Sequence, residues 1–296
     1  MNKKTIAATI LGLALAGSAL GAESAATNTT TANASVWQKL KESPASLNIL
    51  SATDATKNSD HKINGVSMTN IVYLGWKLSE KDSLRLENRW STSKKWQAAT
   101  KEEREMDTTM SRQVIKYSRS GILNQKDHGV NVKAALEGRY YPDHDMRVSK
   151  NSYGLVRPSV SVSRSFESGL SLSNTLYYAK NLNIKTKEHG TTVDYLYLVL
   201  SQSYSFTDKL SLSLTEEFFH AYKKGRKYLK ADSNGKAIRD IENVSISMEL
   251  GYQFNPSIYG GVSVASSPFV AHDQRTTAVD WAKDLGYGFN VYMSAF

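Results

Sequence analysis

The sequence predicts an all-β fold, an antiparallel transmembrane β-barrel of about twelve strands. Three observations lead to this prediction: apolar and polar residues alternate along most of the chain, connections alternate between short and long, and long apolar runs are absent beyond the N-terminus. The 296 residues include 16 Tyr, 18 Gly and only 5 Pro, a composition typical of strand-rich proteins. A helical membrane protein with several spans is excluded, because each span needs about 20 apolar residues.

The N-terminus has the layout of a secretory signal peptide. Lys3 and Lys4 precede an apolar stretch over residues 6–20, and small residues follow as far as Ala22. An N-terminal membrane anchor is the alternative, but it needs a longer apolar run and would not lead into a polar tract. We expect residues 1–22 to be removed on export, which changes the formal charge from +9 to 9 − 2 = +7.

Alternation with a period of two marks the strands. In the clearest case, apolar residues occupy every second position from Val244 to Phe254, and Ser, Glu, Gly and Gln stand between them. Such a strand has one face in an apolar medium and the other in water. The same pattern gives twelve candidate strands, at residues 45–55, 63–78, 83–93, 108–120, 130–141, 153–166, 170–181, 193–206, 210–222, 241–254, 258–268 and 284–296.

The connections between these strands differ in length at the two ends. One end has tight turns at residues 79–82, 167–169, 207–209 and 255–257, with 121–129 as a longer member. The other end has long polar connections, including residues 94–107, 223–240 and 269–283. Short periplasmic turns, long extracellular loops and an even number of strands are typical of a barrel in the bacterial outer membrane. Both chain ends then lie on the periplasmic side.

A closed barrel follows from elementary chemistry, because lipid cannot satisfy backbone hydrogen bonds and a sheet spans a membrane only without free edges. Aromatic residues should form girdles at the two interfaces. The expected periplasmic set is Trp76, Tyr204, Phe206, Tyr252 and Phe254, and the outer set is Trp90, Trp96, Tyr140, Tyr178 and Phe218. A secreted soluble β-protein is the alternative, but its buried face would not carry so many charged or small residues.

The signal peptide, the twelve alternating segments and the terminal Phe296 resemble the bacterial outer-membrane β-barrel porins. The resemblance implies that Phe296 is the signal read by the barrel-assembly machinery. Such a Phe usually has aromatic or apolar residues in phase with it, whereas here Asn290, Tyr292 and Ser294 are in phase. A β-bulge in the last strand would reconcile the two phases; otherwise the expected phase of this strand is wrong. Twelve strands with a basic inner wall are also similar to the small monomeric porins for acidic oligosaccharides.

The apolar phase must face lipid, so the opposite phase lines the pore. The expected pore-lining residues are Arg85, Glu87, Arg89, Arg112, Lys116, Lys133, Glu137, Arg139, Arg157, Glu217 and Glu249. Seven bases and four acids leave 7 − 4 = +3, which predicts a mild preference for anions. We expect a basic wall facing a weakly acidic one, rather than adjacent charges that neutralise each other. In the alternative, four of these residues form a salt-bridged core that closes the lumen: Arg85, Glu87, Arg89 and Glu137.

The segment at residues 23–44 precedes the first strand. It begins with a low-complexity Ala, Thr and Asn tract and then places Val36, Trp37 and Leu40 at helical spacing. One short amphipathic turn is expected there. It either enters the lumen as a plug or lies loose in the periplasm, the commoner fate of a chain terminus.

Enzymatic function is not expected. Asp143, His144 and Asp145 superficially resemble the Asp and His pairs of omptin proteases, but the matching acidic group across the mouth, Asp194 or Asp273, is poorly defined. His220 falls near the outer rim without a convincing partner for a phospholipase. No cysteine is present, and the six histidines are scattered, so no metal site and no cofactor are predicted.

The sequence therefore predicts a passive diffusion channel for small hydrophilic solutes that favours anions. The alternative is a non-conducting structural or adhesin-like barrel that acts through its extracellular loops. Expected partners are outer-membrane lipid and lipopolysaccharide, which the basic loop at residues 223–230 could bind through phosphates, but no nucleic acid. Three outward positions fit the barrel poorly: Arg164, Gln202, and one of the consecutive Glu216 and Glu217.

Overall fold

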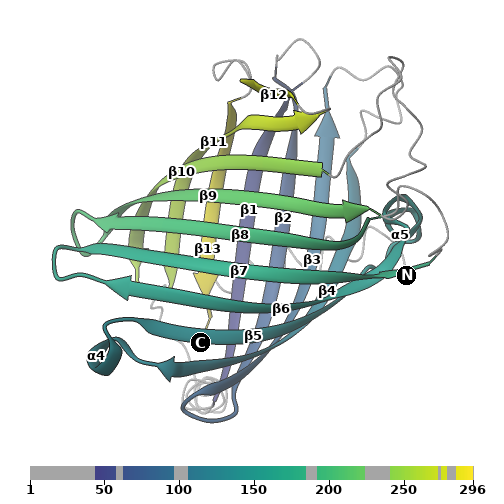
Figure 1. The fold of residues 1–296 in the computed structure, drawn as a ribbon. Helices are drawn as coiled ribbons and strands as arrows, with labels where there is room; N and C mark the ends of the chain where they lie inside the picture. Colours follow the sequence, from purple (N-terminus) through teal and green to yellow (C-terminus); the bar gives the residue numbers. More distant parts are fainter. Residues whose placement is uncertain are drawn as a thin grey trace, which may run out of the picture.

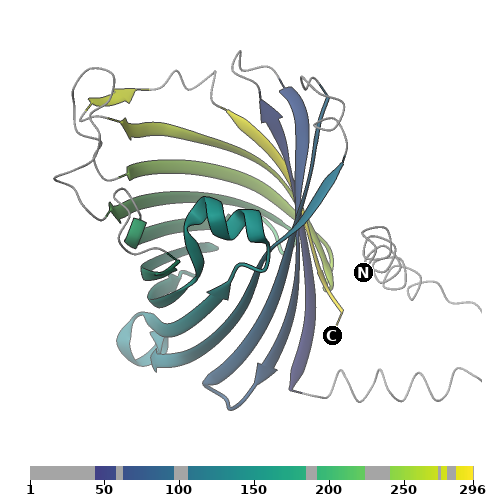
Figure 2. The ribbon, with the colours of Figure 1, turned by 90° about the vertical axis from the view of Figure 1, so that its right-hand side faces the viewer.

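The strands form one antiparallel sheet that closes on itself as a barrel (Figures 1 and 2). The structure, a computed structural model, describes residues 44–57, 63–96, 106–184, 192–223, 241–272, 275–278 and 285–295. Neighbours follow chain order from β1 to β10, then come β11 and β13, and β13 pairs with β1. Twelve long strands in the described part of the chain therefore leave no free edge, as the sequence predicts.

All twelve predicted strands are confirmed, and most bounds differ from those expected by only one or two residues. The long strands are β1 (Ala45–Lys57), β2 (Ile63–Lys77), β3 (Asp82–Lys95), β4 (Asp107–Leu123), β5 (Asn131–Tyr140), β6 (Ser152–Ser165), β7 (Leu170–Asn183), β8 (Thr192–Ser205), β9 (Leu210–Lys223), β10 (Ile241–Asn255), β11 (Ile258–His272) and β13 (Gly286–Ser294). A short additional strand, β12 (Arg275–Ala278), extends β11 as a hairpin.

The two faces of the sheet differ in chemistry because side chains alternate along each strand. On β3, Leu86 is 37% exposed whereas the next residue, Glu87, is only 5% exposed. Exposed large apolar side chains continue along the same outer phase on the other strands, among them Leu136, Leu176, Leu250 and Val262. A large apolar surface of this kind suits lipid rather than water.

Short connections and long ones lie at opposite ends of the barrel. In the turn before β3, the Ser79 hydroxyl donates to Asp82 at 2.8 Å, and the turn after β6 uses Gly169 at φ 85°. The short helix α4 (Gln125–His128) lies at the same, periplasmic end. A second helix, α5 (His144–Lys150), follows β5 at the opposite end (Figure 1).

One β-bulge changes the phase of β4. Arg89 pairs with Arg112 but Trp90 pairs with Met110, so Ser111 is the extra residue and its hydroxyl donates to the Arg89 carbonyl at 3.3 Å. The bulge lets Met110 point outward although Arg112, two residues later, points inward.

The last strand keeps a regular register. β13 pairs with β1 and β11 without a bulge, and Tyr287 and Phe289, about half exposed, face outward. Asn290 and Tyr292 face inward, where Asn290 and the Tyr292 hydroxyl bond to inner-wall side chains. The expected phase for this strand, with Asn290, Tyr292 and Ser294 outward, is therefore wrong, and Phe296 itself lies outside the described residues.

Aromatic residues gather at the strand ends as expected. Tyr204 with Phe206 and Tyr252 with Phe254 each form an edge-to-face pair, with ring centroids 5.1 Å apart, beside the periplasmic turns. Arg164, at the same end, points outward, and its guanidinium carbon lies 4.8 Å from the ring centroid of Phe166. This stacking explains how the outer face can hold the Arg164 charge, since the Phe166 ring covers the guanidinium at the membrane interface.

Three predictions concern parts of the chain outside the described residues: the signal peptide at 1–22, the 23–44 segment apart from Pro44, and the basic loop at 224–230. Among the described residues, no helix is long and apolar enough to cross a membrane.

Candidate functional site

The eleven side chains predicted to line a pore all lie on the inner face of the barrel. That they line an open pore stays a prediction. Their registers agree across strands: Arg85 pairs with Lys116 and Lys116 with Glu137, while Glu137 pairs with Arg157. A basic region therefore covers the inner side of β3, β4, β5 and β6. The same pairings put the apolar neighbours of these residues on the outer face.

Glu87 is the centre of the first charged cluster. Arg85 Nη2, Arg112 Nε and Arg89 Nε lie 3.3, 3.5 and 3.9 Å from its carboxylate oxygens. Three cations around one buried carboxylate more than balance its charge, so positive charge is left in excess. Tyr73 on β2 adds a ring 4.8 Å from the Arg85 guanidinium carbon.

Glu137 is the centre of the second cluster and is more deeply enclosed. Arg139 Nε lies 2.5 Å from its Oε1, and Arg157 Nη2 lies 2.8 Å from its Oε2. The Arg139 and Arg157 side chains are only 11% and 13% exposed, so these ion pairs are shielded from water more than surface pairs are.

Apolar residues lie among the charges on the inner wall. Ile71, Val114 and Leu155 are 2%, 4% and 1% exposed, and they pair with Arg89, Glu87 and Arg139, respectively. Arginine stems can cover apolar groups while the guanidinium stays polar. The charged clusters are thereby held by packing as well as by ion pairs.

The acidic side of the lumen is built from β9 and β10. β10 lies six strands from β4 in either direction around the ring, through β5 to β9 or through β3, β2, β1, β13 and β11. On this side the Ser245 hydroxyl donates to Glu217 at 3.0 Å. Glu249 accepts a hydrogen bond from the Tyr259 hydroxyl at 2.6 Å and another from Asn290.

The expectation that adjacent wall charges would not neutralise each other is wrong. Glu87 and Glu137 are each ion-paired with arginines on their own and neighbouring strands. This arises because residues two apart on a strand, and residues paired across strands, share one face. Five arginines surround only two carboxylates, so the basic side still has excess positive charge.

Sequence reasoning missed an aromatic row on the inner face. Tyr177 on β7 pairs with Tyr197 on β8, and Tyr197 pairs with Phe219 on β9. Tyr195 lies one alternation further along β8, with its ring centroid 5.3 Å from that of Phe219. The signal was present in the alternation, since all four residues occupy the inward phase, which holds mostly polar residues elsewhere on these strands.

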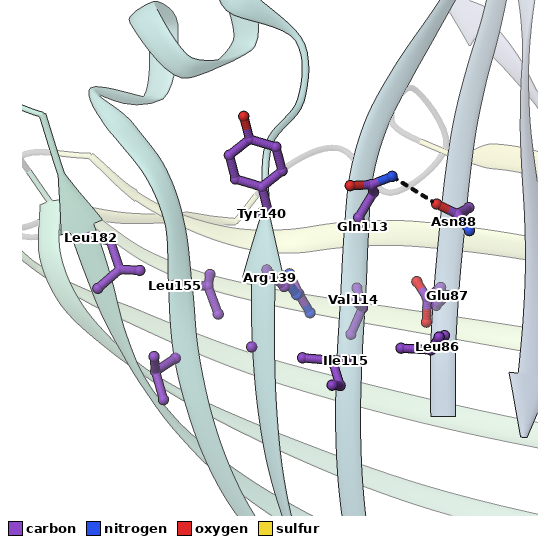
Figure 3. Close-up of a pocket in the computed structure, with 12 residues that line it drawn as sticks. Leu86, Glu87, Asn88, Gln113, Val114, Ile115, Arg139, Tyr140, Leu155 and Leu182 are labelled. Carbon is purple, nitrogen blue, oxygen red and sulfur yellow. Dashed lines mark hydrogen bonds between the residues drawn. The ribbon is translucent and has the colours of Figure 1, made fainter. Parts of the chain in front are cut away.

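A groove of about 500 Å³ lies on the outer side of the wall, where Gly138 leaves a gap between Ile115, Val156 and Leu182 (Figure 3). At its edge the Gln113 amide donates to Asn88 at 3.1 Å. Arg139 points to the opposite face of the sheet, because it is the next residue after Gly138 on β5 and side chains alternate along a strand. The groove therefore faces lipid and is separate from the charged lumen.

The residues considered for catalysis have other surroundings. Asp143 is the N-cap of α5 and accepts a hydrogen bond from the Met146 amide at 2.8 Å. His220 faces outward, with its ring centroid 4.5 Å from that of Tyr222. Asp273 lies outside the described residues, and within the part of the chain that the structure describes no group of three His, Asp or Glu residues is arranged to hold a metal.

Comparison with known proteins gives structural neighbours only. No known protein family and no curated protein matches the sequence. Among solved structures, the chain is similar to the "COG4313 outer membrane channel from Pseudomonas putida F1", with 8% identity, a TM-score of 0.55 and coverage of 85% of this chain and 96% of that chain. It also matches the "KdgM porin", with 9% identity, a TM-score of 0.46 and coverage of 83% and 98%.

The fold is that of a small outer-membrane barrel. A closed antiparallel barrel with an apolar outer face, a polar inner face and short turns at one end is built for a bilayer. These features place the protein in the bacterial outer membrane, as the sequence predicts.

Proposed function

We propose that the protein is an outer-membrane porin, a passive diffusion channel for small hydrophilic solutes with a mild preference for anions. The observation that carries this proposal is the excess of basic groups on β3 to β6. Five arginines surround Glu87 and Glu137, and Lys116 and Lys133 lie on the same inner face without an ion pair among the described residues. Together with Glu87 and Glu137, the far-side Glu217 and Glu249 reduce the net charge of the eleven predicted wall residues to 7 − 4 = +3.

Charge of one sign on a narrow wet wall raises the local concentration of the opposite ion. Low-dielectric walls concentrate the field inside a cleft, so a few charges suffice to bias permeation. A twelve-strand barrel is also wider than the eight-strand barrels that side chains can fill. An open lumen with a positive wall therefore favours small anions over cations of the same size.

The proposal is tested by planar-bilayer conductance of the refolded protein, with the reversal potential measured in a salt gradient. The most informative variant combines Lys116→Glu with Lys133→Glu, because neither lysine forms an ion pair with Glu87 or Glu137. This variant changes the net charge of the eleven wall residues from +3 to 3 − 4 = −1, so the anion preference should invert.

A matched control reverses two arginines that point outward, Arg119→Glu with Arg164→Glu. The net charge changes equally, but the lumen does not, so the reversal potential should stay unchanged. Heat-modifiable gel migration verifies that each variant folds. A folded wild-type barrel that never conducts would contradict the proposal and favour a structural or adhesin-like barrel acting through its loops.

The proposal includes export and assembly steps. A signal peptide at residues 1–22 would direct export, and the barrel-assembly machinery would recognise the end of the chain at Phe296.

The 23–44 segment would either plug the lumen or lie loose, and deleting it distinguishes the two, because only removal of a plug increases conductance. Lipopolysaccharide would bind at the basic loop 223–230. Replacing the five Lys and Arg residues of this loop by Gln should reduce the lipopolysaccharide that co-purifies with the protein.

A further inference from the structure

The aromatic row on the inner wall is continuous across three strands. The ring centroids of Tyr177 and Tyr197 are 5.6 Å apart, and those of Tyr197 and Phe219 are 6.2 Å apart. Tyr195 lies beside Phe219 and pairs with Ala179 on one side and Ala221 on the other. These alanines are 0% and 1% exposed, so small residues make room for the larger ring between them.

The row presents apolar surface to a lumen that is otherwise polar. All four rings are half-buried, which leaves part of each ring accessible from the inside. Phe219 has no polar group at all, and it stands one alternation from the hydrogen-bonded Glu217 on the same strand. The part of this ring that Tyr195 and Tyr197 leave uncovered is apolar surface exposed to water, which a flat apolar group could cover.

One end of the row touches the basic region. The Arg157 guanidinium carbon lies 4.3 Å from the ring centroid of Tyr177, and the same guanidinium binds Glu137. Arg139 belongs to that cluster as well. A cationic site and an apolar ring site are therefore adjacent on the inner faces of β5 to β9.

We propose that this row is a binding site for the ring of small aromatic carboxylates, whose carboxylate group lies toward Arg157 and Arg139. The proposal rests on the proposed channel function, because the solute must enter the lumen to reach the row. It adds a solute class, anions that combine one flat aromatic ring with one carboxylate, to the general preference for anions.

The ring geometry favours an aromatic solute over a saturated ring. Planes within the row are tilted by 39°, 46° and 71°, so they form no flat platform of the kind on which a sugar face would lie. Tilted and edge-to-face contacts are what aromatic rings prefer with one another. The carboxylate adds a charge-assisted contact to guanidinium groups.

The experiment is block of the chloride current by benzoate, compared with cyclohexanecarboxylate, which has similar size and the same charge but a saturated ring. Benzoate should bind more tightly to the wild-type channel. Phe219→Leu and Tyr197→Leu should each weaken benzoate block roughly three- to tenfold, the equivalent of one lost aromatic pair. Cyclohexanecarboxylate block should change by less than the benzoate block in both variants.

The chain supplies a matched control in Phe218, which precedes Phe219 and faces lipid with 39% exposure. Phe218→Leu should leave benzoate block unchanged. Equal block by the two carboxylates, or equal effects of Phe218→Leu and Phe219→Leu, would overturn the aromatic site. Those results leave conductance and anion preference intact, so they are distinct from a failure of the channel proposal, in which no current flows.

A second measurement covers the case in which the Leu variants fold poorly. Saturation-transfer NMR on the unmodified barrel in detergent should show stronger transfer to the benzoate ring protons than to cyclohexanecarboxylate. Arg157→Gln should reduce benzoate transfer. Transfer that is equal for the two compounds would overturn the proposal without any change to the aromatic residues.

Discussion

Arg157 Nη2 lies 2.8 Å from Glu137 Oε2, while the same guanidinium stacks 4.3 Å from the ring centroid of Tyr177. This arginine therefore belongs to two structures at once, the charged clusters of β3 to β6 and the aromatic row of β7 to β9. Its position is fixed from both sides, because the carboxylate sets the guanidinium plane and the ring supports its face.

Removing the central carboxylate should weaken the barrel. Glu137→Gln leaves Arg139 and Arg157 poorly paired in a site that is 3% exposed at residue 137, so the free energy of unfolding should fall by about 3 kcal/mol. Anion preference should rise, since the lumen gains one positive charge. Urea titration in lipid vesicles measures the first effect, and the reversal potential measures the second.

Glu167 provides the control for this change. It lies exposed in the turn between β6 and β7, and Glu167→Gln should alter stability by no more than about 0.5 kcal/mol. Equal stability of the Glu137 and Glu167 variants would mean that the ion pairs contribute no net stabilisation.

Glu216 is expected to destabilise the barrel. It lies in the outward phase of β9, paired with Leu200 and Ile246, and no bulge separates it from the inward Glu217. A carboxylate facing lipid is unfavourable, so Glu216→Leu should increase the free energy of unfolding by about 1 to 2 kcal/mol. Urea titration is again the measurement. Unchanged or lower stability would show that this carboxylate is solvated or paired in the membrane.

Glu217→Leu is the natural comparison for the Glu216 variant. Glu217 accepts a hydrogen bond from the Ser245 hydroxyl on the inner wall, so its replacement removes a negative charge there and should increase anion preference. The Glu216 change should leave selectivity as it was. If Glu216→Leu changed the selectivity and Glu217→Leu did not, the inward and outward faces of β9 would be reversed.

Gly154 should tolerate no side chain. A methyl group there would overlap the Arg139 carbonyl oxygen and lie 2.9 Å from its carbonyl carbon, which forces β5 and β6 apart beside Glu137. Gly154→Ala should cost about 1 to 3 kcal/mol in urea titration, as overpacking does. Gly286→Ala is the control, since a methyl group there would lie an ordinary 3.7 Å from the Ala265 carbonyl oxygen, and it should be nearly neutral. Equal effects would show that the two strands yield easily.

Salt should reduce the anion preference. The Debye length falls from about 10 Å at 0.1 M to about 3 Å at 1 M, so wall charges act on a passing ion over a shorter range. The permeability ratio from reversal potentials should approach unity as salt rises toward 1 M. A ratio that does not change with salt would mean that close binding, not the field of the wall, selects the ion.

The strands could be predicted because lipid and water impose opposite chemistry on alternate residues. A segment such as Val244 to Phe254 has no other reason to alternate so regularly. The bulge at Ser111 was less visible, because Met110 and Arg112 merely look like a local break in the pattern. In β13 the outward phase had to be chosen between Phe296 and the row containing Tyr287 and Phe289, and the apolar row decides it.

Wall residues could be assigned from the sequence, but their pairing could not. Whether Glu137 neutralises Arg157 depends on the register of β5 against β6, which alternation alone does not set. The aromatic row was missed for the same reason. Tyr177, Tyr197 and Phe219 lie far apart in the chain and become neighbours only when three registers are known.

The pairing of β1 with β13 has a consequence for how the protein is made. The Tyr292 hydroxyl reaches Asn48 across a sequence separation of 244 residues, so the two ends of the chain complete the ring together. A chain released before its last strand would be an open sheet with two unsatisfied borders, unable to rest in a bilayer. Barrel closure must therefore wait for β13, so a chain that stops before this strand cannot form a smaller channel.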